Sequence, residues 1–202
     1  RESLDAMLSL CQSIAEDEFL PCAAKLDATE PQFIDGNVET IPELKQAIAA
    51  FKEAGLSASG YDADIGGMQL PWMVDQALNG LFVCANNPVH IYLFLTQGVA
   101  NMLNACGSDE LKDIYLGKLV AGDWFGTMCL SEPQAGSSLA DIRTKAEPLA
   151  DGSYKISGTK MWISGGEQDL TDNIVHMVLA KVPGSPAGVK GISLFLVPKV
   201  RV

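Results

Sequence analysis

The chain has 202 residues, of which 48% are hydrophobic and 19% are charged, a composition typical of a folded globular protein with one large or two modest domains. Its net charge of −11, with only 14 lysines and arginines, argues against a nucleic-acid surface, because phosphate backbones require a concentrated basic face. The five cysteines include no CxxC pair and there are only two histidines, which disfavours both a disulfide framework and a metal site.

The sequence shows no amino-terminal signal pattern and no apolar run that approaches the roughly 18 residues of a membrane span. We therefore expect a soluble protein, and the scattered cysteines favour a reducing compartment, most simply the cytoplasm. The abrupt start at Arg1 and the end at Val202, just after a strand-like run, suggest that the sequence belongs to a longer polypeptide.

The first part of the chain has the hydrophobic period of helices. Apolar residues form one stripe over Leu4–Ala15, and Pro21 is expected to end this helix. Thr40 and Glu43 have the spacing of a capping box, which predicts a second helix that stops at Gly55. A loop rich in glycine and aspartate, SGYDADIGGMQLP, follows it.

Three further helices are predicted before the period changes. One follows Pro71, and a more uniformly apolar one over Pro88–Ala105 is expected to be central, because almost no side of it is polar. Asp109 favours the start of another helix, with Lys118 near its end, as the helix dipole prefers.

After Gly122 the pattern becomes that of strands, and Asp151-Gly152 is a strong hairpin signal. The expected strands are the run WFGTMCL, Thr144–Leu149, Tyr154–Ser164, Asn173–Val182 and Gly191–Val197. Helices first and strands afterwards indicate an α+β fold. We expect an all-helical domain over residues 1–122, followed by a small antiparallel β-barrel or sandwich domain over residues 123–202.

Common catalytic motifs are missing from the sequence. It contains no GxGxxG after a strand and no GxxxxGK[ST], GxSxG or HExxH. Ser137, His176 and Asp141 could form a Ser–His–Asp triad, but such trios occur by chance in any chain of this size, so the signal is weak.

Two stretches suit a ligand. The loop MCLSEPQAGSS, residues 128–138, is rich in small residues that are ill suited to a core. In GTKMWISGG, period two places Lys160, Trp162 and Ser164 on one strand face and Met161 and Ile163 on the other. An indole beside a hydroxyl and two glycines suits a flat aromatic ligand, although a core tryptophan followed by a glycine turn would give the same residues.

These stretches resemble signatures of the acyl-CoA dehydrogenase family. MCLSEPQAGSS is similar to C-[LV]-[ST]-E-P-x-x-G-S, and YKISGTKMWISGG is similar to Y-x-[IL]-x-G-x-K-x-[WF]-I-[ST]-x-G. YDADIGGMQLP looks like the Gly-Gly loop of the family, and GSDELKDIYLGKLVAGDWFGTMCL looks like the helix that leads into its middle domain. The stretch GEQDLTDNIVHMVLAKVPGSPAGVKGISLFLVPK is most similar to the branch that includes 3-methylmercaptopropionyl-CoA dehydrogenases, which implies a short or modified acyl-CoA as substrate.

The resemblance implies that both stretches lie along FAD. Ser131 would hydrogen-bond the pyrimidine side of the flavin, Ser164 would approach its N5 region, and Trp162 would pack beside the isoalloxazine. Ser137 would also contact the acyl-CoA, whereas Glu132 is better interpreted as a cap or brace of the loop. The implied cofactor-binding residues are Met128, Leu130, Ser131, Gly136, Ser137, Trp162, Ile163 and Ser164.

The helix over Pro88–Ala105 is expected to line the acyl pocket. Ile91, Leu95 and Gly98 are the candidate contacts, because they fall at helical spacing and Gly98 leaves room beside the chain. The alternative is that all three are ordinary core residues.

The family reaction removes the α proton of the thioester with a carboxylate base while a hydride leaves the β carbon for flavin N5. The family's base lies in a carboxy-terminal helical domain that we expect this sequence to lack, so no residue here is expected to be catalytic. The resemblance also implies an electron-transfer flavoprotein or similar acceptor as partner, and a homodimer or homotetramer. Three alternatives stay open: a flavin oxidase or monooxygenase on the same scaffold, a non-catalytic acyl-CoA-binding or partner-binding relative, and a protein of this fold without a ligand.

Overall fold

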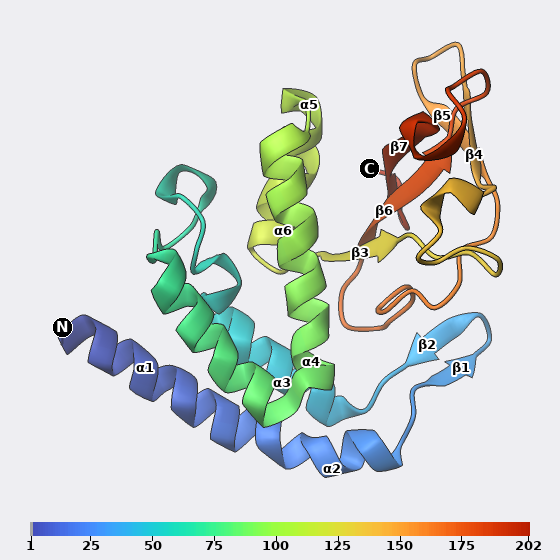
Figure 1. Cartoon of the computed structure of the whole chain (residues 1–202). Coiled ribbons are helices and arrows are strands. Elements are labelled where there is room, and N and C mark those ends of the chain that lie inside the picture. The colour runs from blue at the N-terminus through green and yellow to red at the C-terminus, as the bar shows by residue number, and fades with distance from the viewer. Residues whose placement is uncertain (1) are drawn as a thin grey trace.

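The computed structural model describes residues 2–202 and confirms the α+β class. Helices form the first part of the chain, and a curled mixed sheet lies beside them (Figure 1). The helices are α1 (Glu2–Ile14), α2 (Leu20–Ala28), α3 (Pro42–Glu53), α4 (Trp72–Cys106), α5 (Asp109–Leu111) and α6 (Gly117–Val120). The strands are β1 (Gln32–Ile34), β2 (Asn37–Glu39), β3 (Phe125–Cys129), β4 (Lys145–Pro148), β5 (Tyr154–Ser157), β6 (Ile174–Lys181) and β7 (Ile192–Pro198). Shorter turns are π-helical at Ala15–Phe19 and Lys112–Leu116, and 3₁₀-helical at Leu56–Ala58, Ala63–Ile65, Leu139–Asp141 and Gly188–Gly191.

The first helix does not end at Pro21, as the sequence predicted, but continues through α2. A π turn over Ala15–Phe19 joins α1 to α2, and Pro21 falls in the first turn of α2. The change of helical register at the π turn falls just before Pro21, so the chain passes this residue, which has no N–H to donate, without ending the helix. The prediction failed because it did not allow for a change of helical register before the proline.

A short hairpin of β1 and β2 interrupts the helical part and was not predicted. Its turn is Asp35-Gly36, with φ angles of 49° and 85°. Such left-handed angles favour glycine and aspartate, so the Asp-Gly pair was the signal that could have revealed the hairpin. The predicted stop of α3 at Gly55 is confirmed, because this residue follows the helix with a φ of 72°.

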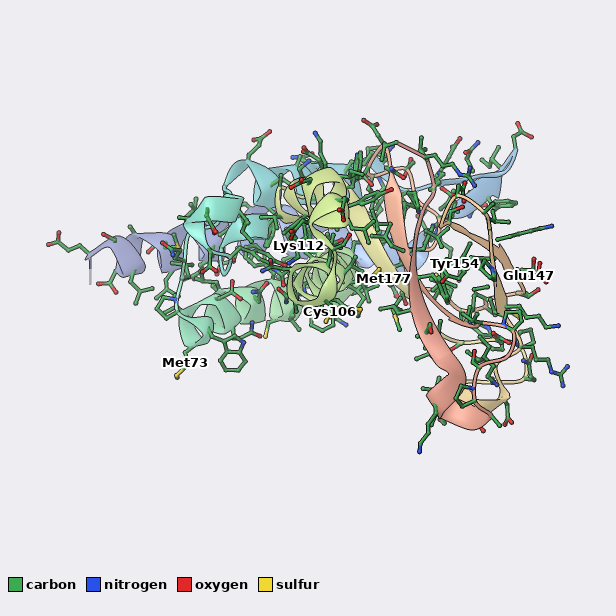
Figure 2. All side chains as sticks on the ribbon, turned by 90° about the horizontal axis from the view of Figure 1, so that it is seen from above. Met73, Cys106, Lys112, Glu147, Tyr154 and Met177 are labelled. Atoms are coloured by element: carbon green, nitrogen blue, oxygen red, sulfur yellow. The ribbon has the colours of Figure 1, made fainter. Side chains whose placement is uncertain are left out.

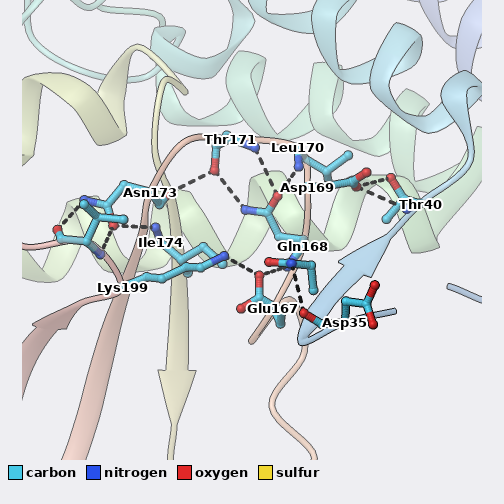
Figure 3. Close-up of polar contacts among 12 residues, drawn as sticks. Asp35, Thr40, Glu167, Gln168, Asp169, Leu170, Thr171, Asn173, Ile174 and Lys199 are labelled. Atoms are coloured by element: carbon cyan, nitrogen blue, oxygen red, sulfur yellow. Dashed lines mark hydrogen bonds and ion pairs between the residues drawn. The ribbon is translucent and has the colours of Figure 1, made fainter. Parts of the chain in front are cut away.

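The predicted capping box at the start of α3 was wrong. The helix begins after Ile41, which makes no side-chain cap. Thr40 donates its hydroxyl to Oδ1 of Asp169 at 2.7 Å, and its backbone N–H donates to the same oxygen at 3.2 Å. Lys45, in the first turn of α3, forms an ion pair with Asp169 at 2.6 Å. Asp169 therefore ties the start of α3 to the loop that precedes β6 (Figure 3).

α4 contains both the third and the fourth predicted helix. The two halves meet at Asn86, whose φ of −162° and ψ of 90° are not helical, shortly before Pro88. Oδ1 of Asn86 accepts a hydrogen bond from the N–H of Val89 at 3.3 Å, which caps the second half, and its Nδ2 donates to the carbonyl of Phe19 at 3.0 Å. Although α4 is 35 residues long, none of the helices in residues 2–202 combines the length and apolarity that a bilayer crossing requires.

Asn86→Ala should lower the free energy of unfolding by about 2 kcal/mol, because the variant loses a helix cap and removes a donor from the Phe19 carbonyl. Urea unfolding of the full-length protein, followed by circular dichroism, measures the difference. Asn104→Ala is the matched control, since Asn104 is exposed on the same helix. Equal unfolding midpoints for the two variants would contradict the role assigned to Asn86.

The sheet is mixed, whereas the sequence predicted an antiparallel one. Its strand order is β3–β6–β4–β5, and β7 also pairs with β6. β3 and β4 run parallel to β6, and the β4–β5 and β6–β7 pairs are antiparallel. Parallel neighbours require long connections, and a set of strand-like runs does not reveal which of them are joined in this way. β5 covers only Tyr154–Ser157 of the strand predicted over Tyr154–Ser164.

α4 crosses directly over β3, and this contact joins the helices to the sheet. A Cβ added at Gly126 on β3 would come within 2.6 Å of Cβ of Val99 on α4. The Gly126 N–H donates to Oγ1 of Thr96, also on α4, at 3.0 Å. Val99 belongs to a buried cluster with Val175 and Met177 of β6, and Met177 lies at the boundary between helices and sheet (Figure 2). The helical part and the sheet therefore share a core.

Candidate functional site

A hollow on the sheet lies where the second ligand-like stretch of the sequence passes over it. Its volume is about 430 Å³, within the range of small-molecule sites. Strands β3, β6 and β7 supply part of its lining, and the segment from residue 160 to residue 167 supplies the rest. The lining includes Cys129, Lys160, Trp162, Ile163, His176 and Val197.

The stretch that carries the predicted tryptophan is not a strand beyond Ser157. The sequence predicted that this stretch is a strand with two faces, and this prediction was wrong. It concerned Lys160, Trp162 and Ser164 on one face and Met161 and Ile163 on the other. The strand stops where the backbone of Gly158 packs tightly against Thr144. A Cβ at Gly158, where φ is 156°, would come within 2.4 Å of Oγ1 of Thr144.

Trp162 lines the hollow, and most of its side chain is exposed to solvent. Its φ of 57° is a left-handed conformation that residues other than glycine seldom adopt. The residue is 74% exposed, which excludes the core tryptophan that the sequence left open. The indole is therefore available to a ligand.

Glu132 braces the loop that follows β3, as the sequence indicated. It is 3% exposed, and its carboxylate accepts hydrogen bonds from the backbone N–H groups of Arg143 at 2.6 Å and Thr144 at 3.1 Å. The ammonium of Lys160 donates to Oε1 at 2.9 Å, and the amide of Gln134 donates to Oε2 at 2.8 Å. Burial alone would raise the pKa of Glu132, but hydrogen bonds from Thr144, Arg143 and Lys160 outweigh it and lower the pKa to about 2.

The two predicted flavin segments lie against each other. The N–H of Met161 donates to the carbonyl of Ser131 at 3.0 Å. Ser131 is half-buried and Ser164 is exposed, so neither is a core residue. Met128 and Cys129 pair with β6 and not with the tryptophan segment. The other predicted cofactor residues are the half-buried Met128, Leu130 and Ile163 and the exposed Gly136 and Ser137.

The sequence singled out His176 only as a member of a weak trio, yet it lines the hollow. Its Nδ1 lies 2.7 Å from Oγ1 of Thr127, its neighbour on β3. Burial lowers the pKa of His176, so the imidazole is neutral at pH 7. None of the hydrogen bonds found in residues 2–202 joins His176 to Ser137 or Asp141, and Asp141 accepts one from Ser138 at 2.6 Å, so the trio is not formed. The available signal was a single histidine inside the apolar strand IVHMVLAK.

The side of α4 that carries the predicted acyl contacts is open. Ile91 and Leu95 are half-buried and Gly98 is exposed, so an ordinary core role does not describe them. Phe94, on the same side, is 58% exposed. Sequence reasoning missed Phe94, although its spacing of three residues from Ile91 and four from Gly98 places it on their helix face.

The chain matches two consecutive family profiles along nearly its whole length. Residues 1–123 match the N-terminal domain of acyl-CoA dehydrogenases, and residues 127–202 match the middle domain. The chain belongs to the acyl-CoA dehydrogenase family.

Two relatives show how much of an acyl-CoA dehydrogenase the chain represents. It is 42% identical over 184 residues to a 3-methylmercaptopropionyl-CoA dehydrogenase of Ruegeria pomeroyi, and this alignment covers 91% of this chain and 31% of the relative. It is 38% identical over 197 residues to a broad-specificity linear acyl-CoA dehydrogenase of Mycobacterium tuberculosis, and this alignment covers 96% of this chain and 32% of the relative. The chain therefore spans about a third of the length of these relatives.

The fold is that of acyl-CoA dehydrogenases of known structure. An acyl-CoA dehydrogenase of Bacillus anthracis, solved in complex with FAD, superposes with a TM-score of 0.77 at 23% identity. The match covers 98% of this chain and 31% of that one. Structural relatives of the chain thus bind FAD, and the shared fold includes both the helices and the sheet.

The low pKa of Glu132 predicts a pH dependence of stability. The pKa is about 2 in the folded chain against an ordinary value of 4.5. The ionised carboxylate therefore stabilises the fold above pH 4.5, and this contribution is lost as the pH falls from 4.5 toward 2. Urea unfolding between about pH 5 and about pH 3 should show a shallower loss of stability for Glu132→Gln than for the wild type.

Glu147→Gln is the control for this experiment, because Glu147 is exposed on β4 of the same domain. It should lose stability in parallel with the wild type. Parallel curves for Glu132→Gln and the wild type would show that Glu132 is not held as a stabilising anion.

Proposed function

We propose that the full-length protein containing this chain is an FAD-dependent acyl-CoA dehydrogenase, which forms a double bond between the α and β carbons of an acyl-CoA thioester. The observation that carries the proposal is Trp162, which is 74% exposed and stands beside the hollow. An exposed aromatic residue in an unfavourable backbone conformation beside a concave site is typical of a ligand-binding position. The relatives named above support the same class of reaction.

The residues present fit a flavin. The isoalloxazine is a flat ring with a polar edge, and the chain offers the indole of Trp162 and the unburied hydroxyls of Ser131 and Ser164. A Cβ at Gly136 would meet nothing within 4 Å, so the loop is open on that side. The proposed cofactor-binding residues remain Met128, Leu130, Ser131, Gly136, Ser137, Trp162, Ile163 and Ser164.

FAD, when bound, supplies the acceptor for the hydride. The residues of this chain hold and orient the ring, and the neutral hydroxyls of Ser131 and Ser164 suit an edge that becomes electron-rich on reduction. Glu132 is not the base. Its pKa is about 2 and its two oxygens already accept hydrogen bonds, whereas a general base needs a pKa nearer the working pH and a free lone pair. We assign no residue of this chain as the base.

The proposed substrate is an acyl-CoA with a short or modified acyl chain. Similarity to a 3-methylmercaptopropionyl-CoA dehydrogenase supports this class. The open side of α4, with Ile91, Phe94, Leu95 and Gly98, is the proposed wall for the acyl chain. Ser137, exposed on the loop after β3, is the proposed contact to the rest of the substrate.

An electron-transfer flavoprotein or a similar acceptor is the proposed partner, and a homodimer or homotetramer is the proposed assembly. Exposed apolar side chains at the start of α4 support an assembly, since Trp72 and Met73 are 74% and 78% exposed. Met73 points outward from the helical part (Figure 2). The free cysteines, three of them buried, favour a reducing compartment such as the cytoplasm.

The absorption spectrum of the purified full-length protein tests the proposal. We expect a yellow protein whose flavin absorbance is bleached by a short-chain acyl-CoA under anaerobic conditions. The double variant Ser131→Ala with Ser164→Ala should bind FAD roughly tenfold to a hundredfold more weakly, the usual range for lost hydrogen bonds to a charging group.

Ser193→Ala, an exposed serine on β7, is the control and should bind FAD like the wild type. A colourless protein, or a yellow one that no acyl-CoA bleaches, would contradict the dehydrogenase. Peroxide formation at the expense of oxygen during turnover would identify the oxidase instead.

Gly98→Leu should shorten the preferred acyl chain, because the new side chain would project from the proposed wall into the space for the acyl chain. A Cβ at Gly98 meets nothing within 4 Å, so the fold should tolerate the change. The measurement is kcat/KM over a series of straight-chain acyl-CoA substrates. Gly80→Leu, at a second unobstructed glycine of α4, is the matched control, and equal chain-length profiles for the two variants would refute the assignment.

A further inference from the structure

The ion pair between Glu132 and Lys160 is buried at the junction of the two segments proposed to hold the flavin. Their side chains are 2% and 11% exposed, and Nζ of Lys160 lies 2.9 Å from Oε1 of Glu132. The other ion pairs found in residues 2–202 join side chains that are all at least 27% exposed. This pair is therefore set apart by its burial.

Lys160 holds the loop after β3 at a second point. Its ammonium also donates to the carbonyl of Leu130 at 3.0 Å. The next residue, Met161, donates its N–H to the carbonyl of Ser131 at 3.0 Å. Lys160 and Met161 thus form hydrogen bonds to three successive residues of the loop, 130–132. Trp162 is the next residue after Met161. The position of Trp162 relative to Ser131 depends on these contacts.

Compared with an apolar pair of similar size, the intact ion pair between Glu132 and Lys160 is expected to add little stability. Removing two charges from water offsets most of their attraction, so buried ion pairs are often no more stabilising than apolar residues of similar size. Without Lys160, the carboxylate of Glu132 keeps the N–H donors of Arg143, Thr144 and Gln134. Removing Lys160 alone leaves a buried carboxylate without its counter-charge, which should destabilise the domain, but the three remaining donors should keep it folded while the tryptophan segment loosens.

Trp162 requires such an anchor. A left-handed backbone is unfavourable in a residue other than glycine and persists only where the surroundings enforce it. The φ of Trp162 is 57° and its side chain is mostly exposed, so the side chain has little contact with which to enforce that backbone. The bonds of Lys160 and Met161, directly before Trp162, are the neighbouring contacts that can enforce it.

We propose that Lys160 is a positioning residue of the flavin site. Its bonds to Glu132 and Leu130 hold the tryptophan segment against the loop after β3, and this fixed arrangement sets the affinity for FAD. The inference rests on the proposed function, because it takes these two segments as the flavin site. Lys160 acts through Trp162 and Ser131 and need not touch the cofactor.

Lys160→Met in the full-length protein tests the proposal, because methionine keeps an apolar stem and removes the ammonium. Hydrogen–deuterium exchange of the flavin-free protein should become faster in peptides that cover residues 128–132 and 158–164. The FAD dissociation constant, measured by titration of flavin fluorescence, should rise roughly tenfold or more. Lys160→Arg, which keeps a cation and its donors, should restore most of the affinity.

Two variants separate positioning from simple loss of stability or charge. Asn86→Ala is expected to destabilise the helical part, and Lys25→Met removes the cation of an exposed ion pair. Both should leave the FAD dissociation constant within about twofold of the wild type. An equal weakening by Asn86→Ala would overturn the proposal.

The failure of this inference differs from the failure of the proposed function. Unchanged exchange in Lys160→Met, or faster exchange with unchanged FAD affinity, would overturn the positioning role alone. A wild-type protein that binds no FAD would overturn the proposed function and the positioning role together, whatever the exchange shows.

Discussion

α4 packs so closely on β3 that Gly126 has no room for a side chain of its own, and the rest of the structure depends on this contact. Val99 fills the space that a Cβ would need, and the hydroxyl of Thr96 accepts the Gly126 N–H. The opposite side of the same half of α4 carries the open apolar face with Phe94, and β3 leads directly into the loop with Ser131. One helix–strand contact thus fixes the distance between the proposed acyl wall and the proposed flavin loop.

The sequence predicted the features that depend on local burial. The hydrophobic period predicted the order of helices and strands, and the combined resemblance of several stretches indicated the family. Prediction failed where a distant residue decides the structure. Thr40 has the spacing of a helix cap, but Asp169, 129 residues away, takes its hydroxyl. The strand that begins at Tyr154 stops at Ser157, where the backbone of the next residue, Gly158, packs tightly against Thr144. Neither partner can be read from the neighbouring residues.

The candidate site shows the same division between local and long-range information. The sequence picked out Trp162 and the loop after β3, because an aromatic residue beside hydroxyls and glycines is a local pattern. It could not show that Trp162 leaves the strand conformation and stands exposed, since that depends on how the segment is held. It also gave little weight to His176, because the neighbour of this residue, Thr127, lies on a parallel strand 49 residues earlier.

The loop after β3 places a buried anion next to a residue proposed to address the flavin. An uncompensated carboxylate at Glu132 would oppose the build-up of negative charge on a ring near Ser131, because charges interact strongly where water is excluded. Lys160 cancels that charge at 2.9 Å, and the backbone N–H groups of Arg143 and Thr144 add further positive ends of dipoles. The buried carboxylate of Glu132 then adds little net negative charge near the proposed flavin edge. A loop that needs a buried acid for its shape can in this way serve a cofactor that gains electrons.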